Sequence, residues 1–180
     1  MSMERSAGDP AGRAPPWTGG CRCGAVRLEV TAAPVMAVAC HCKGCRRMTG
    51  GAYSLSLMLP EAGFRLTAGE TVRAGLGAAL EDGRALGSGE NPDLAAALDH
   101  RACPVCKSWM FTRIAMLPDM VNLRAAMLDR DEWVTPFVET CRAEAQPGVV
   151  TGARHAFDGF PDAAAWPGLM AAYAREGARP

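Results

Sequence analysis

The sequence predicts a mainly β domain, and two kinds of observation support that fold class. Short runs of residues alternate apolar with polar side chains, as Val26, Leu28 and Val30 do with Arg27 and Glu29. The runs are bounded by glycine, proline and other turn residues, so the elements are short and closely spaced. The chain has 180 residues, of which 49% are hydrophobic, which is enough to bury the core of one globular domain.

Further short strands are expected where apolar or alternating runs lie between turn signals. These predicted strands cover residues 35–39, 53–59, 64–67, 71–74, 109–117 and 121–128. Only one or two short helices are expected. Asn91 as a cap, followed by Pro92, predicts a helix over residues 92–99. Leu169, Met170 and Tyr173 would share one helical face, which predicts a short closing helix in the tail.

Composition also suggests how the chain is organised. Residues 1–16 mix charged residues with glycine and proline, so a flexible N-terminal arm is expected there. Residues 17–180 are expected to form a single domain, in which residues 75–100 are an insertion loop that carries the short helix. No apolar run is long enough to cross a membrane and no signal peptide is recognisable, so a cytoplasmic location is expected. The formal net charge of zero removes the broad electrostatic case for nucleic acid or an anionic membrane as a partner.

The chain contains eight cysteines, and in a cytoplasmic protein their spacing favours metal binding over disulfides. Cys21 and Cys23 are two residues apart, so in an extended chain both thiols leave the same face. Cys103 and Cys106 frame a Cys-Pro-Val-Cys turn, which directs two thiolates to one point. Together the two pairs would supply the four sulfurs of a closed structural zinc site, which contributes roughly 10 kcal/mol or more to folding.

A second cluster lies between these pairs and offers three thiols, from Cys40, Cys42 and Cys45. Three protein ligands leave the fourth position of a tetrahedral zinc for water or substrate, which is typical of a reactive site. The alternative is that Cys141 or His41 completes a second closed site. Eight cysteines divide evenly into two four-cysteine sites, so both interpretations stand.

If the second site is open, its charge determines which ligand suits it. Three thiolates leave a zinc ion with a net charge of −1, a weaker Lewis acid than a site made of histidines. A thiol is more acidic than water, so the natural incoming ligand is the thiolate of a substrate. Arg46 and Arg47 directly follow the cluster, where they could offset its negative charge and clamp a substrate carboxylate. Charge balance on a solvated surface is the alternative role for either arginine.

Three stretches of the chain resemble the glutathione-dependent formaldehyde-activating enzyme family: residues 19–27, 40–50 and 103–106. The order and spacing of seven cysteines are similar, as is the Arg-Arg-x-Thr-Gly sequence that ends the central stretch. The resemblance covers the chain from Gly19 to about Leu128. Lys107 stands where family members usually have glycine, and the region of Phe137 to Cys141 lacks a histidine and a tryptophan that are frequent there.

The resemblance implies a fold of several coiled, mainly antiparallel sheets around the zinc sites, with two zinc ions per chain. It implies that Cys21, Cys23, Cys103 and Cys106 hold the structural zinc. By the same resemblance, Cys40, Cys42 and Cys45 are catalytic and hold the second zinc, which faces substrate. The family's named activity joins formaldehyde to the thiol of glutathione, with S-hydroxymethylglutathione as the product class.

The leading functional hypothesis is therefore a zinc-dependent carbon–sulfur lyase-like enzyme that acts on a small thiol or its aldehyde adduct. The rival is a non-catalytic interaction module in which two closed zinc sites serve folding only. A third, minor hypothesis is a redox or metal sensor whose exposed thiolates oxidise and release zinc. The sequence makes no prediction about the particular substrate or the oligomeric state.

Overall fold

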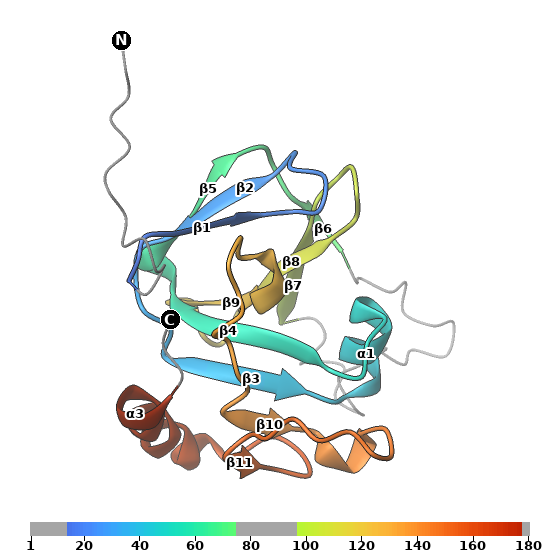
Figure 1. Ribbon diagram of the computed structural model, residues 1–180, viewed down its shortest axis with the longest axis vertical. Helices are drawn as coiled ribbons and strands as arrows, with labels where there is room; N and C mark the ends of the chain where they lie inside the picture. Colours follow the sequence, from blue (N-terminus) through green and yellow to red (C-terminus); the bar gives the residue numbers. More distant parts are fainter. Residues whose placement is uncertain (1–13, 75–96, 178–180) are drawn as a thin grey trace.

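A computed structural model describes residues 14–74 and 97–177, which form two β-sheets and two α-helices (Figure 1). The smaller sheet has three antiparallel strands in the order β1 (Trp17–Gly20), β2 (Arg27–Val30) and β5 (Phe64–Ala68). The larger sheet has eight strands, whose spatial order is β11 (His155–Ala156), β10 (Val138–Thr140), β3 (Met36–Cys40), β4 (Ser54–Pro60), β9 (Met120–Arg124), β8 (Trp109–Ile114), β7 (Leu98–Ala102) and β6 (Val72–Arg73). The predicted mainly β fold with little helix is confirmed.

Helices occupy the margins of the larger sheet. In Figure 1, α1 (Lys43–Thr49) lies at the end of β3, and α3 (Trp166–Glu176) lies at the lower left. The described residues also form short 3₁₀ helices: η1 (Glu61–Gly63), η2 (Ala125–Met127), η3 (Arg142–Glu144) and η4 (Ala163–Ala165). No helix of the described residues is long and apolar enough to cross a membrane.

One of the two predicted helices is confirmed, and the end of the other is wrong. The closing helix of the tail is confirmed as α3, which buries Leu169 and Tyr173. Of the predicted helix 92–99, residues 92–96 lie outside the described residues, as do residues 1–13 of the predicted arm and 75–96 of the predicted insertion. The end of that predicted helix is wrong, because Leu98 and Asp99 belong to β7, where they pair with Ile114 and Arg113 of β8.

The two faces of the larger sheet differ sharply in chemistry. On one face Leu57 lies opposite Leu123, and Leu123 lies opposite Phe111 of β8. The ring of Phe111 meets that of Phe64 at 4.9 Å, so this apolar face packs against the smaller sheet. Neighbouring residues along a strand point to opposite faces, so the residues between these apolar ones form a second face. That second face, where β3, β4 and β9 run side by side, carries polar residues, among them Ser54, Ser56 and Arg124.

Gly19 is a point of close approach between the smaller sheet and the chain after β9. A side-chain carbon at Gly19 would lie 2.1 Å from the carbonyl oxygen of Met127, so the backbone at Met127 would have to move. Gly19 also forms an isolated bridge with Leu128, which that movement would break. Gly19→Ala should therefore lower the free energy of unfolding by about 2 to 3 kcal/mol, measured by urea denaturation. Gly159→Ala, which meets nothing within 4 Å and needs no left-handed backbone, is the control for adding a methyl group; equal effects would contradict this account.

Candidate metal centres

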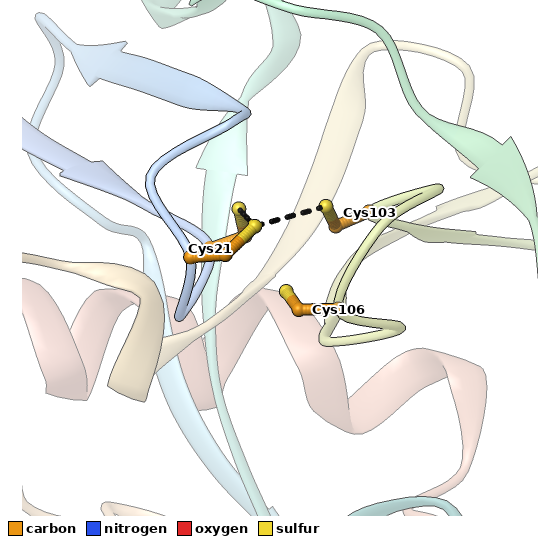
Figure 2. Close-up of side chains that lie close together, drawn as sticks. Cys21, Cys103 and Cys106 are labelled. Atoms are coloured by element: carbon orange, nitrogen blue, oxygen red, sulfur yellow. Dashed lines mark hydrogen bonds between the residues drawn. The ribbon is translucent and has the colours of Figure 1, made fainter.

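The first cysteine cluster joins the two sheets. Cys21 and Cys23 lie in the turn between β1 and β2, and Cys103 and Cys106 lie in the turn between β7 and β8. Figure 2 shows sulfurs from these two turns directed toward one another. The four sulfurs all lie within 4.8 Å of one another, with Cys21 to Cys23 at 3.5 Å and Cys23 to Cys103 at 3.8 Å. Zinc–sulfur bonds of about 2.3 Å in a tetrahedron place sulfurs about 3.8 Å apart, so this cluster fits zinc.

Backbone hydrogen bonds hold each half of this cluster. The Cys21 Sγ accepts a hydrogen bond from the Val26 amide at 3.3 Å, and the Cys103 Sγ accepts one from the Val105 amide at 3.4 Å. Hydrogen bonds to Ser108 lower the pKa of Cys106 to about 5, which favours the thiolate that zinc requires. Lys107 ends the turn with a φ of 61°, the left-handed conformation that glycine adopts at least cost. That conformation gives a physical reason for the glycine expected at this position.

The second cluster is built around the start of α1. Cys40 is the last residue of β3, Cys42 caps the helix, and Cys45 lies in its first turn. Cys42 serves as the cap because its Sγ accepts a hydrogen bond from the Cys45 amide at 3.3 Å. The three sulfurs lie within 4.8 Å of one another, which fits three ligands of one metal ion.

Cys141 lies beside this second cluster but outside the group of three. Its Sγ is 4.0 Å from that of Cys40, because β10 runs parallel to β3 and Thr140 pairs with Cys40. Cys141 is itself held in a left-handed conformation, with φ at 56° and its amide donating to the Gly159 carbonyl at 2.8 Å. The alternative of closure by Cys141 therefore has a geometric basis.

The other candidate for closing the site, His41, does not join the cysteines. Its ring is fully buried, 5.5 Å from the Tyr53 ring and with Nε2 3.4 Å from the Glu139 carboxylate. His41 directly follows Cys40, the last residue of β3, so the two side chains leave the extended chain on opposite sides. Among the described residues it belongs to no cluster that could hold a metal.

The thiols of the second cluster strongly influence one another's protonation. Hydrogen bonds with Cys141, Cys42 and Cys45 lower the pKa of Cys40. The thiolate of Cys40 in turn raises the pKa of Cys45, and hydrogen bonds with Cys141 and Cys40 raise the pKa of Cys42. Like charges this close cannot all ionise without a cation, so binding of a metal by all three requires proton release.

The two arginines proposed from the sequence have different surroundings. Arg46 is half-buried and its Nε donates to the His41 carbonyl at 3.1 Å, whereas Arg47 is exposed on α1. Within the described part of the chain, neither guanidinium is bonded to a cysteine of the second cluster, and their role as a substrate clamp stays a prediction.

A third arginine, Arg124 on β9, was missed by the sequence analysis. It is only 6% exposed, and its guanidinium carbon lies 4.0 Å above the centre of the Trp109 ring. Burial lowers the pKa of Arg124 to about 10, while the charges of Cys45, Cys40 and Cys42 act in the opposite direction. The only signal in the sequence is its position between apolar residues of a strand, which ordinarily indicates a solvent-facing side chain.

His100 adds a neutral imidazole to the same region. Its Nδ1 is 2.8 Å from the Thr112 hydroxyl, which also accepts a hydrogen bond from the Trp109 indole at 3.2 Å. Burial and the nearby charge of Arg124 lower the pKa of His100 to about 4. At neutral pH His100 is therefore uncharged and adds no positive charge beside Arg124.

Comparison with known proteins identifies the family. The family model described as glutathione-dependent formaldehyde-activating enzyme matches residues 16–143. The chain belongs to this family. A Rhodobacter sphaeroides protein of known crystal structure is similar at 20% identity and a TM-score of 0.45, over 62% of this chain and 87% of that chain. No protein with curated information matches the chain.

Both cysteine clusters lie within the residues that match the formaldehyde-activating family. Arg124 lies there too, whereas β11 and α3 lie beyond the match. Cys141 lies close to the end of the match. In the described residues, the sulfurs of four cysteines come together in the first cluster and those of three in the second.

Proposed function

We propose that this member of the glutathione-dependent formaldehyde-activating family is a zinc-dependent carbon–sulfur lyase-like enzyme acting on a small thiol or its aldehyde adduct. The observation that supports this most directly is the difference between the two clusters. Four sulfurs come together in the first, which suits a closed structural zinc, and three come together in the second. Two zinc ions per chain are part of the proposal, with Cys40, Cys42 and Cys45 holding the second.

The proposed chemistry joins or separates a thiol sulfur and a carbonyl carbon. Addition forms one carbon–sulfur bond, the carbonyl electron pair moves to oxygen, and the thiol proton ends on the new hydroxyl group. Zinc in the second cluster would supply a position at which the substrate sulfur is held as a thiolate. The positive charge of buried Arg124, within electrostatic reach of these cysteines, favours that anionic form.

The rival function, a module with two closed zinc sites, is favoured by one specific observation. Cys141 lies 4.0 Å from Cys40, which is close to the sulfur spacing of a tetrahedral site. If Cys141 is a permanent fourth ligand, no position remains for a substrate thiol.

Cobalt substitution separates these functions, because cobalt–thiolate absorption bands report the ligands of each site. We expect two cobalt ions per chain and a saturable change in those bands as glutathione is added. S-methylglutathione, which has no free thiol, is the control and should leave the bands unchanged. We also expect Cys141→Ala to retain both metal ions. Release of one metal by Cys141→Ala, together with bands that glutathione does not change, would instead support the closed module.

A further inference from the structure

The polar face of the larger sheet lies next to the second cysteine cluster. The register pairs Cys40 with Ser54 across β3 and β4, and it pairs Ser56 with Arg124 across β4 and β9. Directly opposed residues share a face, and so do residues two apart, so Ser54, Ser56 and Arg124 lie on the same face as Cys40. Thr140 joins them, because it pairs with Cys40 from the other side.

This face carries an unusual number of buried polar atoms without a hydrogen-bond partner. Ser54 is 1% exposed, and its hydroxyl group lacks a partner among the described residues. Thr140 is 0% exposed, and its hydroxyl group lies against the Cys40 thiol. Within residues 14–74 and 97–177, the Nε of Arg124 and the carbonyl oxygen of the Asn122 side chain also lack a hydrogen-bond partner. Other such atoms of the described residues belong to His41, Glu61 and His155, but those on this face lie beside the second cluster. Buried polar groups are almost always satisfied in folded proteins, so this part of the face suits a polar ligand.

Arg124 gives this face its charge preference. Within residues 14–74 and 97–177, no carboxylate lies within ion-pair distance of its guanidinium. Its Nη2 donates a hydrogen bond to the Asn122 carbonyl oxygen, a long contact of 3.4 Å. Trp109 packs against the guanidinium, whose carbon lies 4.0 Å from the ring centre, and the Nε of Arg124 remains for an acceptor among the described residues.

Charge balance alone does not account for this arrangement. A cluster of three thiolates with zinc has a net charge of −1, which a buried cation would offset. That role needs a charge, but it needs neither the planar group of an arginine nor a buried hydroxyl group without a partner, such as that of Ser54. A bound carboxylate would satisfy both the guanidinium and the buried hydroxyl groups. It accepts two parallel hydrogen bonds from a guanidinium and further hydrogen bonds from hydroxyl groups.

We infer that the polar face of Ser54, Ser56, Thr140 and Arg124 is a subsite for a substrate carboxylate, with Arg124 as its anchor. The inference rests on the proposed function, since the carboxylate belongs to the thiol that binds at the second cluster. It names the substrate class as anionic thiols, and it assigns the recognition of the anion to Arg124 rather than to Arg46 and Arg47.

The test compares two small thiols on the cobalt-substituted protein. 3-Mercaptopropionate carries a carboxylate, and 2-mercaptoethanol carries a neutral hydroxyl group. We expect the wild-type protein to bind mercaptopropionate about 10- to 100-fold more tightly, the range of a buried charge-assisted hydrogen bond. Arg124→Gln should reduce this ratio to about 1. Loss of the positive charge weakens both thiolates alike at the second cluster, so the ratio of the two affinities is the readout and not either affinity alone.

Two further variants make the result specific. Arg65→Gln removes an exposed arginine of the smaller sheet, paired with Glu29 at 2.8 Å, and should leave the ratio unchanged. Arg124→Lys keeps the charge but loses the planar edge, so it should retain the cobalt content and show an intermediate ratio. This variant also serves if Arg124→Gln does not fold.

The possible outcomes separate the inference from the function on which it rests. Equal affinities of the wild-type protein for the two thiols would overturn the subsite and leave thiol binding intact. A ratio that persists in Arg124→Gln and Arg124→Lys would overturn the role of Arg124. If neither thiol changes the cobalt bands, the proposed function fails and the subsite fails with it.

Discussion

Cys103→Ser is expected to remove one metal ion per chain and most of the stability of the domain. Cys103 is fully buried, and its cluster ties the turn after β1 to the turn after β7. Serine offers an oxygen that is a poor zinc ligand, so the tetrahedral site loses one of its four ligands. Structural zinc in small peptides contributes about 10 to 16 kcal/mol, whereas whole domains are stable by only about 5 to 15 kcal/mol. Metal content and a thermal unfolding curve measure both effects.

The control for Cys103→Ser lies in the same turn. Val105 is 68% exposed, so Val105→Ser changes the turn without touching the cluster, and it should keep both metal ions. If Cys103→Ser retained its metal and unfolded within a few degrees of the wild-type protein, the first cluster would not be a structural zinc site.

Cys42→Ser should have the opposite pattern, with activity lost and the fold kept. The thiol of Cys42 is one of the three in the second cluster, so the metal there should be bound much more weakly. The fold should survive because serine is itself a favourable helix cap and its hydroxyl can accept from the Cys45 amide. We expect formation of S-hydroxymethylglutathione to fall at least about 100-fold, the scale of losing a principal electrostatic group.

Two measurements check Cys42→Ser together: product formation by NMR and the thermal unfolding midpoint. Lys43→Ala changes the neighbouring exposed residue of α1 and should leave both close to wild type. Full activity of Cys42→Ser would contradict the catalytic role of the second cluster. Unfolding of the variant would contradict the separation of a structural cluster from a reactive one.

The sequence predicted the parts of the fold whose signals are local. β2 and β4 were predicted from strict alternation, and α3 from its apolar face. α1 was missed, because its seven residues are too few for a helical period and its cap is a cysteine. β7 was missed because its strand conformation depends on pairing with β8, a contact that no local pattern reveals.

The candidate site shows the same division between local and distant signals. The cysteines of both clusters could be grouped from their spacing, because metal ligands come in short, recognisable runs. The positions of Cys141 and Arg124 could not, since each reaches the second cluster through strand pairing. Arg124 was overlooked because polar positions of an alternating strand normally face solvent, and here that face is buried.

The opposite orientation of two neighbouring residues on β9 has a consequence for how this protein can change. Leu123 points into the apolar core, fully buried, while Arg124 points to the polar face beside the second cluster. A substitution that repacks the core around Leu123 would shift the same few atoms of backbone that position the guanidinium. Thermal stability and substrate preference are therefore linked traits in this domain, and selection acting on one would alter the other.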